Sequence, residues 1–217
     1  MSAEQTPEQV PVQENTPEAE ATPEKRGPPA DRPLRQKKEK KPKKVVEKPP
    51  PPDPVTFIDA RVGKIVKVAY VEGADTLFCE DVDIGDGVTK HVVTSVRAYY
   101  TLEQLQDRRV IIFTNMHPAK MRGETSEAML FAGSTPEPDV CELLDPPADA
   151  PIGTRVQFGH FSVEGEAPGI DKKNNHWKKV APFLRIDENG VATYKGEPLT
   201  TPQGVITVPN IRNCEFH

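Results

Sequence analysis

The uneven distribution of proline and aromatic residues limits which part of this chain can fold. Thirteen of the 24 prolines lie in residues 1–54, and that stretch contains no Phe, Trp or Tyr. A segment of this composition cannot bury enough apolar surface to compensate for the conformational entropy lost on folding. We therefore predict a disordered tail over residues 1–54 and a folded region over residues 55–217, which is long enough for one good core and a small appended subdomain.

Charge divides the tail further. Residues 1–24 hold six Glu and no basic residue, whereas residues 25–48 hold eleven Lys or Arg against three acids. The overall net charge of −5 hides this basic arm (residues 25–48), because residues 55–217 are net acidic. Lys clusters on a disordered tether bind phosphates, so we expect the arm to bind a polyanion; a solubilising tail and a nuclear-localisation-type patch are the alternatives. A short polyproline spacer follows at residues 49–54. The arm's central phosphate ligands are Lys37, Lys38, Lys40, Lys41, Lys43 and Lys44.

Several classes of function lack support in this sequence. The chain has no apolar run long enough to span a bilayer and no secretory signal, which favours a cytoplasmic protein. Cys79, Cys141 and Cys214 form no zinc-type spacing and indicate a reducing compartment without a structural disulfide. No phosphate loop, metalloprotease motif or nucleophile elbow occurs. We therefore expect no enzyme activity, no metal and no cofactor.

Short β-branched runs separated by turn residues indicate an all-β domain over residues 55–148. Thr101 and Gln104 have the spacing of a capping box, which predicts a short helix between the third and fourth runs. Five short strands with a helix in that place fit an oligonucleotide-binding (OB) barrel, although a small β-sandwich has a similar pattern. The predicted strands are residues 62–70, 77–84, 90–96, 109–115 and 128–132.

Residues 149–217 predict a smaller α/β subdomain packed on the barrel. We expect a helix within residues 171–184, broken near Pro182, with Trp177 in the subdomain core. Further short strands are predicted at residues 155–158, 191–194 and 205–208.

The segment between the fourth and fifth predicted strands combines features that suit nucleic acid. Lys120 and Arg122 point the same way if this segment is an extended loop, and both then contact phosphates. Asn115 and Ser126 either bond nucleotide edges and sugar hydroxyls or satisfy the local backbone. Met121 either stacks on a base or fills the core.

Two further basic groups are weaker candidates for nucleic-acid contact. Arg61 and Lys64 flank a glycine in the first predicted strand. A second basic cluster lies in the C-terminal part, where contact with a nucleic-acid backbone and plain solvation are equally compatible with the sequence. This second basic cluster consists of Lys172, Lys173, Lys178 and Lys179.

The run Pro118-Ala119-Lys120-Met121-Arg122-Gly123 resembles the tRNA-binding domain of the endothelial monocyte-activating polypeptide II type. This domain also occurs as a C-terminal appendage of some tyrosyl- and methionyl-tRNA synthetases and in synthetase cofactors. The later matching segments are those of its two-part eukaryotic form, whose appendix replaces a dimer interface and implies a monomer. The resemblance continues through Asp59 to Ile65, Ala74 to Leu77, Glu142 to Pro147, Lys172 to Trp177 and Tyr194 to Gly196.

The resemblance implies a non-catalytic tRNA-binding cofactor that works with aminoacyl-tRNA synthetases, possibly the methionyl or tyrosyl enzyme. The barrel would recognise tRNA by shape and backbone, and the basic arm would add affinity. The sequence departs from the family at Val71-Glu72, Thr94-Ser95, His117 and Ala128, and residues 55–217 are net acidic, which shifts expected binding toward the arm. A scaffold of a multi-synthetase complex with incidental RNA affinity is the alternative, and a released signalling fragment is a third.

Overall fold

The structure is a computed structural model that describes residues 52–161, 165 and 168–217. Residues 1–51 of the predicted disordered tail lie outside the described residues. They include the basic arm, with the six lysines named above, and half of the polyproline spacer. The described residues belong to one compact unit. Within its described residues no helix is long and apolar enough to cross a membrane.

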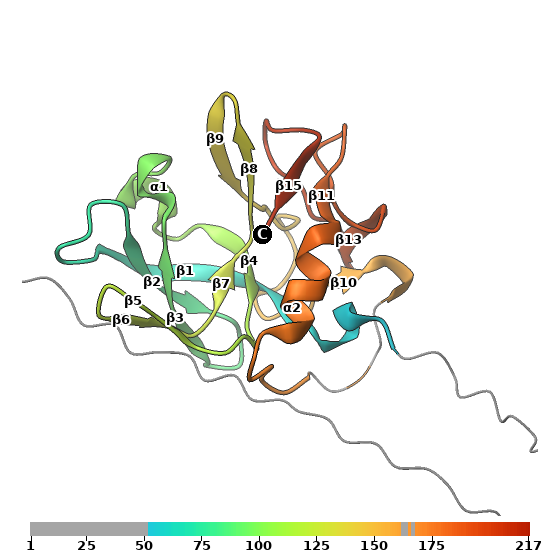
Figure 1. Cartoon of the computed structure of the whole chain (residues 1–217), viewed down its shortest axis with the longest axis horizontal. Coiled ribbons are helices and arrows are strands. Elements are labelled where there is room, and N and C mark those ends of the chain that lie inside the picture. The colour runs from blue at the N-terminus through green and yellow to red at the C-terminus, as the bar shows by residue number, and fades with distance from the viewer. Residues whose placement is uncertain (1–51, 162–164, 166–167) are drawn as a thin grey trace, which may run out of the picture. The chain divides into compact units, whose positions relative to one another are not determined.

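Five antiparallel strands form the predicted barrel, in the order β3-β2-β1-β4-β7 (Figure 1). The predicted helix is also confirmed: Thr101 and Gln104 close a capping box at the start of α1 (Leu102–Leu105). A 3₁₀ turn, η2 (Val96–Ala98), follows the third strand. The strands are β1 (Ala60–Tyr70), β2 (Phe78–Asp83), β3 (Thr89–Thr94), β4 (Arg109–Phe113) and β7 (Met129–Leu130).

The fourth strand has apolar contacts on both of its faces. Val110 and Ile112 point into the barrel, while Ile111 and Phe113 belong to a second core outside it. A continuous apolar run is the sequence pattern of a strand covered on both sides. Gly63 of β1 allows the close approach needed here, since a Cβ on it would lie 2.7 Å from Val82 Cγ1.

The barrel is nearly closed at the seam between β3 and the segment that leads into β7. The Glu127 amide donates to the His91 carbonyl at 2.8 Å, and the Val93 amide donates to Ser126 Oγ at 3.0 Å. Beyond these bonds β3 and β7 are not paired strands. These bonds bridge the two edges of the barrel, but they do not join β3 and β7 along their length.

After β7 the chain leaves the barrel and builds a second antiparallel sheet. The hairpin β8–β9 pairs with the C-terminal strand, so this sheet extends across the predicted division at residue 148. Its path is β10-β13-β12-β11-β15-β8-β9, with β14 on β13. The strands are β8 (Ala132–Pro136), β9 (Asp139–Leu143), β10 (Gln157–Phe158), β11 (Leu184–Ile186), β12 (Ala192–Tyr194), β13 (Glu197–Thr201), β14 (Gly204–Val205) and β15 (Cys214–Phe216).

The predicted helix of the C-terminal part is shorter than expected. It forms α2 (Asn175–Val180) and passes into a 3₁₀ turn, η4 (Ala181–Phe183), which contains Pro182. The residue before it, Asn174, has a left-handed conformation with φ of 50°, which delays the start of the helix. In Figure 1, α2 lies against the first described element, η1 (Pro54–Phe57). A further 3₁₀ turn, η3 (Gly159–Phe161), follows β10.

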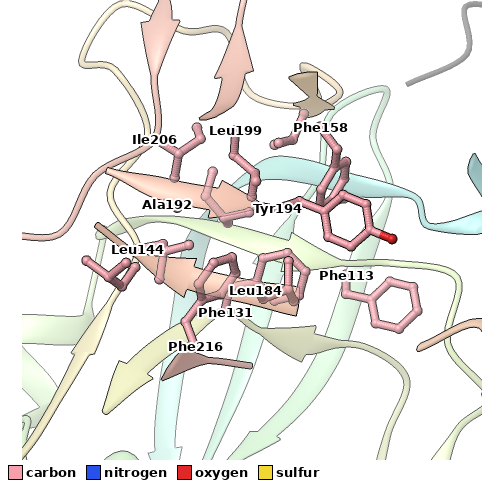
Figure 2. Close-up of a cluster of buried hydrophobic side chains, with 14 of the residues drawn as sticks. Phe113, Phe131, Leu144, Phe158, Leu184, Ala192, Tyr194, Leu199, Ile206 and Phe216 are labelled. Carbon is pink, nitrogen blue, oxygen red and sulfur yellow. The ribbon is translucent and has the colours of Figure 1, made fainter. Parts of the chain in front are cut away.

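The second core joins the barrel to the C-terminal sheet. Figure 2 shows Phe113 and Phe131 from the barrel side among Tyr194, Phe216 and their neighbours. Trp177 of α2 packs on this core as predicted, with its ring 5.3 Å from that of Phe113 and 5.6 Å from that of Phe131. The two parts therefore share a hydrophobic interior.

An ionic clamp holds the start of the described chain. The Asp53 carboxylate accepts bonds from the Val55 amide at 3.0 Å, the Tyr194 hydroxyl at 2.8 Å and Lys195 Nζ at 2.5 Å. Hydrogen bonds to Lys195 and to the Val55 amide lower the pKa of Asp53 despite desolvation, while burial and the bond to Asp53 raise the pKa of Tyr194 to about 12. Asp53, assigned from sequence to the spacer, therefore belongs to the folded structure.

Candidate nucleic-acid interface

The segment between β4 and β7 forms a hairpin rather than the extended loop assumed from the sequence. Strand β5 (Ala119–Met121) pairs with β6 (Glu124–Ser126), and Lys120 lies opposite Thr125. Arg122 and Gly123 form the turn, with φ of 50° and 96°. Two positive φ values are typical of the tight turns that suit the twist of a hairpin. Because Arg122 is in this turn and not on an extended loop, strand alternation does not fix its direction relative to Lys120.

The hairpin carries its two cations on the surface. Lys120 and Arg122 are both exposed, and neither makes an ion pair with a described carboxylate. Met121, between them, is half-buried and packs on a small cluster that includes Val71 and Val93. The hairpin therefore rests on the barrel through Met121, while its two cations have no ion-pair partner among the described residues.

Ser126 and Asn115 anchor the hairpin from the inside. Ser126 is buried; its Oγ accepts from the Val93 amide and donates to the Ala128 carbonyl at 2.8 Å. The Asn115 side chain is also buried: its Oδ1 accepts from the Asp59 amide, and its Nδ2 donates to the carbonyls of Phe57 and Gly169. Both side chains thus satisfy backbone groups, which is the second of the two interpretations left open by the sequence.

The C-terminal part attaches directly to the base of the hairpin. The Asp171 amide donates to the Asn115 carbonyl at 3.0 Å, and Asn174 Oδ1 accepts from the His117 amide at 2.8 Å. The second basic cluster lies in the same segment: Lys172 and Lys173 stand between Asp171 and Asn174, and Lys178 and Lys179 follow in α2. All four of its lysines are exposed, and none has an ion-pair partner among the residues that the structure covers. The fold therefore places the segment that carries this cluster beside the hairpin, a contact that no pattern in the sequence predicts.

The other two candidate cations are already neutralised by carboxylates. Arg61 pairs with the buried Asp59 at 3.0 Å, and Arg155 approaches the same carboxylate at 3.6 Å. Lys64 pairs with Asp107 at 2.7 Å on the surface. Arg61 and Lys64 therefore differ from the hairpin cations, because each already has a carboxylate partner.

Glu80 of β2 is fully buried. Its Oε1 accepts from the Thr94 hydroxyl at 2.5 Å, and its Oε2 has no partner among the described residues. Burial raises the pKa of Glu80 to about 7, and the Thr94 bond offsets only part of that effect. The alternation of β2 is the one sequence signal for this site, because it puts Glu80 on the same face as the buried Phe78 and Val82.

The raised pKa of Glu80 predicts a pH-dependent stability. The folded protein holds a proton on Glu80 that the unfolded chain releases near the ordinary glutamate pKa of 4.5. The free energy of unfolding should therefore fall as the pH rises from about 5 to 7, by about 3 kcal/mol at most. Urea denaturation of the wild-type chain and of Glu80→Gln across this range tests this. A pH dependence that is the same in both chains would assign the effect to other groups.

The three cysteines all lie in the part of the chain that the structure describes. Cys79, Cys141 and Cys214 are all free thiols, and burial raises the pKa of each. No group of three or more His, Cys, Asp or Glu side chains that could hold a metal ion occurs in the part of the chain that the structure describes.

A barrel of this topology with an exposed cationic hairpin is an OB-type nucleic-acid-binding module. Residues 60–155 match the family model described as a putative tRNA binding domain. The chain therefore carries a domain of this tRNA-binding family, and the resemblance noted in the sequence is confirmed.

The relatives share this domain but are mostly much longer proteins. The chain is 41% identical over 157 residues to the cytoplasmic methionine–tRNA ligase of Arabidopsis thaliana, covering 72% of this chain and 19% of the ligase. It is 37% identical over 147 residues to aminoacyl tRNA synthase complex-interacting multifunctional protein 1 of Cricetulus griseus, covering 68% of this chain and 40% of that protein. The chain thus spans between a fifth and two fifths of these two relatives.

A solved structure extends the likeness to the C-terminal part. The C-terminal domain of Plasmodium vivax p43 is 27% identical, with a TM-score of 0.68, and the match covers 76% of this chain and 99% of that domain. The barrel and the C-terminal sheet thus have a counterpart in a domain of known structure.

Proposed function

We propose that this chain is a non-catalytic, cytoplasmic tRNA-binding cofactor of aminoacyl-tRNA synthetases. The observation that carries the proposal is the hairpin within the matched region, where Lys120 and Arg122 are exposed without an ion-pair partner among the described residues. Cations in this state can neutralise phosphates without first breaking a protein salt bridge. Binding through phosphates recognises the shape and backbone of tRNA more than its sequence.

Each candidate residue has a distinct role in this proposal. Lys120 and Arg122 bind phosphates, with Arg122 able to make a bidentate contact. Asn115 and Ser126 fix the shape of the hairpin from below, and Met121 holds its tip against the barrel. The second basic cluster extends the phosphate-binding surface. Arg61 and Lys64 make a smaller contribution, because each is already paired with a carboxylate.

The basic arm is the second RNA ligand in this proposal. Its lysines Lys37, Lys38, Lys40, Lys41, Lys43 and Lys44 raise affinity and association rate through counterion release. Two weak contacts on one chain reinforce each other, because binding of one raises the effective concentration of the other.

The partners in this proposal are tRNA and a synthetase, with the chain acting as a monomer. The similarity to a domain of methionine–tRNA ligase supports the methionyl enzyme as a partner class, and the similarity to a complex-interacting protein supports action in trans. We propose binding rather than catalysis because the matched region in the ligase is a minor part of that enzyme.

Replacing Lys120 and Arg122 together with alanine tests the hairpin. We expect tRNA affinity to fall about 10- to 100-fold and the slope of log affinity against log salt to shrink by about 2, because two phosphates are no longer neutralised. The control is Lys67→Ala with Arg185→Ala, which removes two exposed charges from β1 and β11, of which Arg185 is paired with Glu215 at 2.9 Å. Filter binding of tRNA across a salt series gives both quantities.

An equal loss in both double variants would contradict the hairpin as the site. The scaffold alternative is favoured by one observation, the net acidic composition of residues 55–217. It would be supported instead if the hairpin variant bound tRNA normally and synthetases co-purified with the chain after ribonuclease treatment.

A further inference from the structure

A cavity of about 250 Å³ opens at the barrel seam, directly under the hairpin. Val93 and Ser126, which form one of the two seam bonds, both line it. Ser95, just after β3, lines it on one side, and Ala119 and Met121 of the hairpin line it on the other. Met116 and Met129 contribute two more thioether side chains.

The walls of this cavity suit a flat heterocycle. Met side chains are polarizable and adapt their shape to the face of an aromatic ring. The volume is below the roughly 300–1,000 Å³ typical of sites for drug-sized ligands, so it fits one ring system better than a whole nucleotide. Thr94 also lines the cavity, and its hydroxyl is hydrogen-bonded to the buried Glu80. This is a polar group on an otherwise mostly apolar wall.

The two cations of the hairpin indicate the charge of the ligand that this cavity would bind. Ala119 and Met121 line the cavity, whereas Lys120 between them is absent from the lining and exposed to solvent, as expected for side chains that alternate along a strand. Arg122 is exposed at the adjoining turn. A mostly apolar cavity beside cations that have no ion-pair partner among the described residues matches a ligand with a flat apolar part and a flanking negative charge.

We propose that this cavity receives one unstacked base of a bound RNA, while the hairpin cations hold the adjacent phosphates. This inference rests on the proposed function and assigns a base site to it. Proteins that bind single-stranded RNA commonly combine phosphate contacts with base stacking. The ligand class is therefore an RNA loop or end in which a base is free to leave its stack.

The test compares two polymers that differ only in their bases. The full-length chain is titrated with a short oligouridylate and with an abasic ribose-phosphate oligomer of the same length and charge, at one fixed salt concentration. We expect the oligouridylate to bind about tenfold more tightly, which is the effect of a single stacked base. Replacing Lys120 and Arg122 together with alanine should lower the affinity for both polymers by the same factor.

A variant that fills the cavity tests whether the higher affinity for the oligouridylate arises there. Ser95→Tyr places a large side chain at the cavity and should reduce oligouridylate affinity to the abasic level. Thr89→Tyr is the matched control, because Thr89 is an exposed hydroxyl residue at the other end of β3, outside the cavity lining. Thermal unfolding verifies that both variants fold.

The outcomes separate this inference from the proposed function. Equal affinity of the wild-type chain for the two polymers, or equal effects of the two tyrosine variants, would overturn the base site and leave tRNA binding intact. Binding of neither polymer nor tRNA would overturn the proposed function itself. A wild-type dimer that Ser95→Tyr converts to a monomer would assign the cavity to a second copy of the chain, and would also overturn the base site.

Discussion

Phe131→Ala is expected to lower the free energy of unfolding of residues 49–217 by about 3–5 kcal/mol, in one cooperative transition. Phe131 is fully buried and follows β7, at the point where the chain leaves the barrel. Its ring contacts Phe113 of β4, Trp177 of α2 and Phe216 of β15. Truncating it opens a cavity between the barrel and the C-terminal sheet, so the packing of both parts is weakened together. Urea denaturation followed by far-UV circular dichroism and by fluorescence measures the change.

Phe183→Ala is the matched control for that experiment. The same residue type is removed from the same compact unit, but Phe183 is 49% exposed, so the expected loss is only about 1 kcal/mol. Two separate transitions in Phe131→Ala, with the barrel surviving the first, would show that the two parts fold independently. That result would contradict the shared core as the source of stability.

Deleting residues 25–48 is expected to have the largest effect on RNA binding. This segment carries eleven of the 28 basic residues. If most of them contact phosphates, the salt slope of tRNA binding should shrink by about 4–6, and affinity at low salt should fall on the order of a thousandfold. The deletion leaves Asp53 in place, so the ionic clamp with Lys195 is retained.

Deletion of residues 1–24 is the control for length. It removes the same number of residues and six Glu, but no cation. The salt slope should therefore not decrease in this variant. An unchanged slope after deletion of residues 25–48 would show that the arm does not contact RNA and that the described domain binds alone.

Local patterns predicted much of the barrel, because each of its main elements has a short-range signal. The capping box at Thr101 and Gln104 located α1, and alternation located β2. The hairpin β5–β6 was missed, because its strands have only three residues each and its turn requires a positive φ at Arg122, an uncommon residue for that conformation. The C-terminal sheet was only partly predicted, since its two- and three-residue strands are too short to show a period.

The candidate site was predictable as a set of residue types but not as an arrangement. The charges of Lys120 and Arg122 are evident in the sequence, whereas the structural roles of Asn115 and Ser126 depend on partners tens of residues away. The contact of Asn174 with the backbone of His117 joins segments 57 residues apart and could not be read from either one. Burial of Glu80 inside the barrel depends on the register of β2 against β3.

The position of Trp177 makes intrinsic fluorescence a reporter of the contact between α2 and the barrel. It is the only tryptophan in the chain, and its ring stacks on Phe113 and Phe131 across the junction between α2 and the barrel. Its emission wavelength therefore depends on whether this helix remains docked, with no label required. Because α2 also carries Lys178 and Lys179, the same fluorescence can be followed during an RNA titration to learn whether the ligand moves this helix.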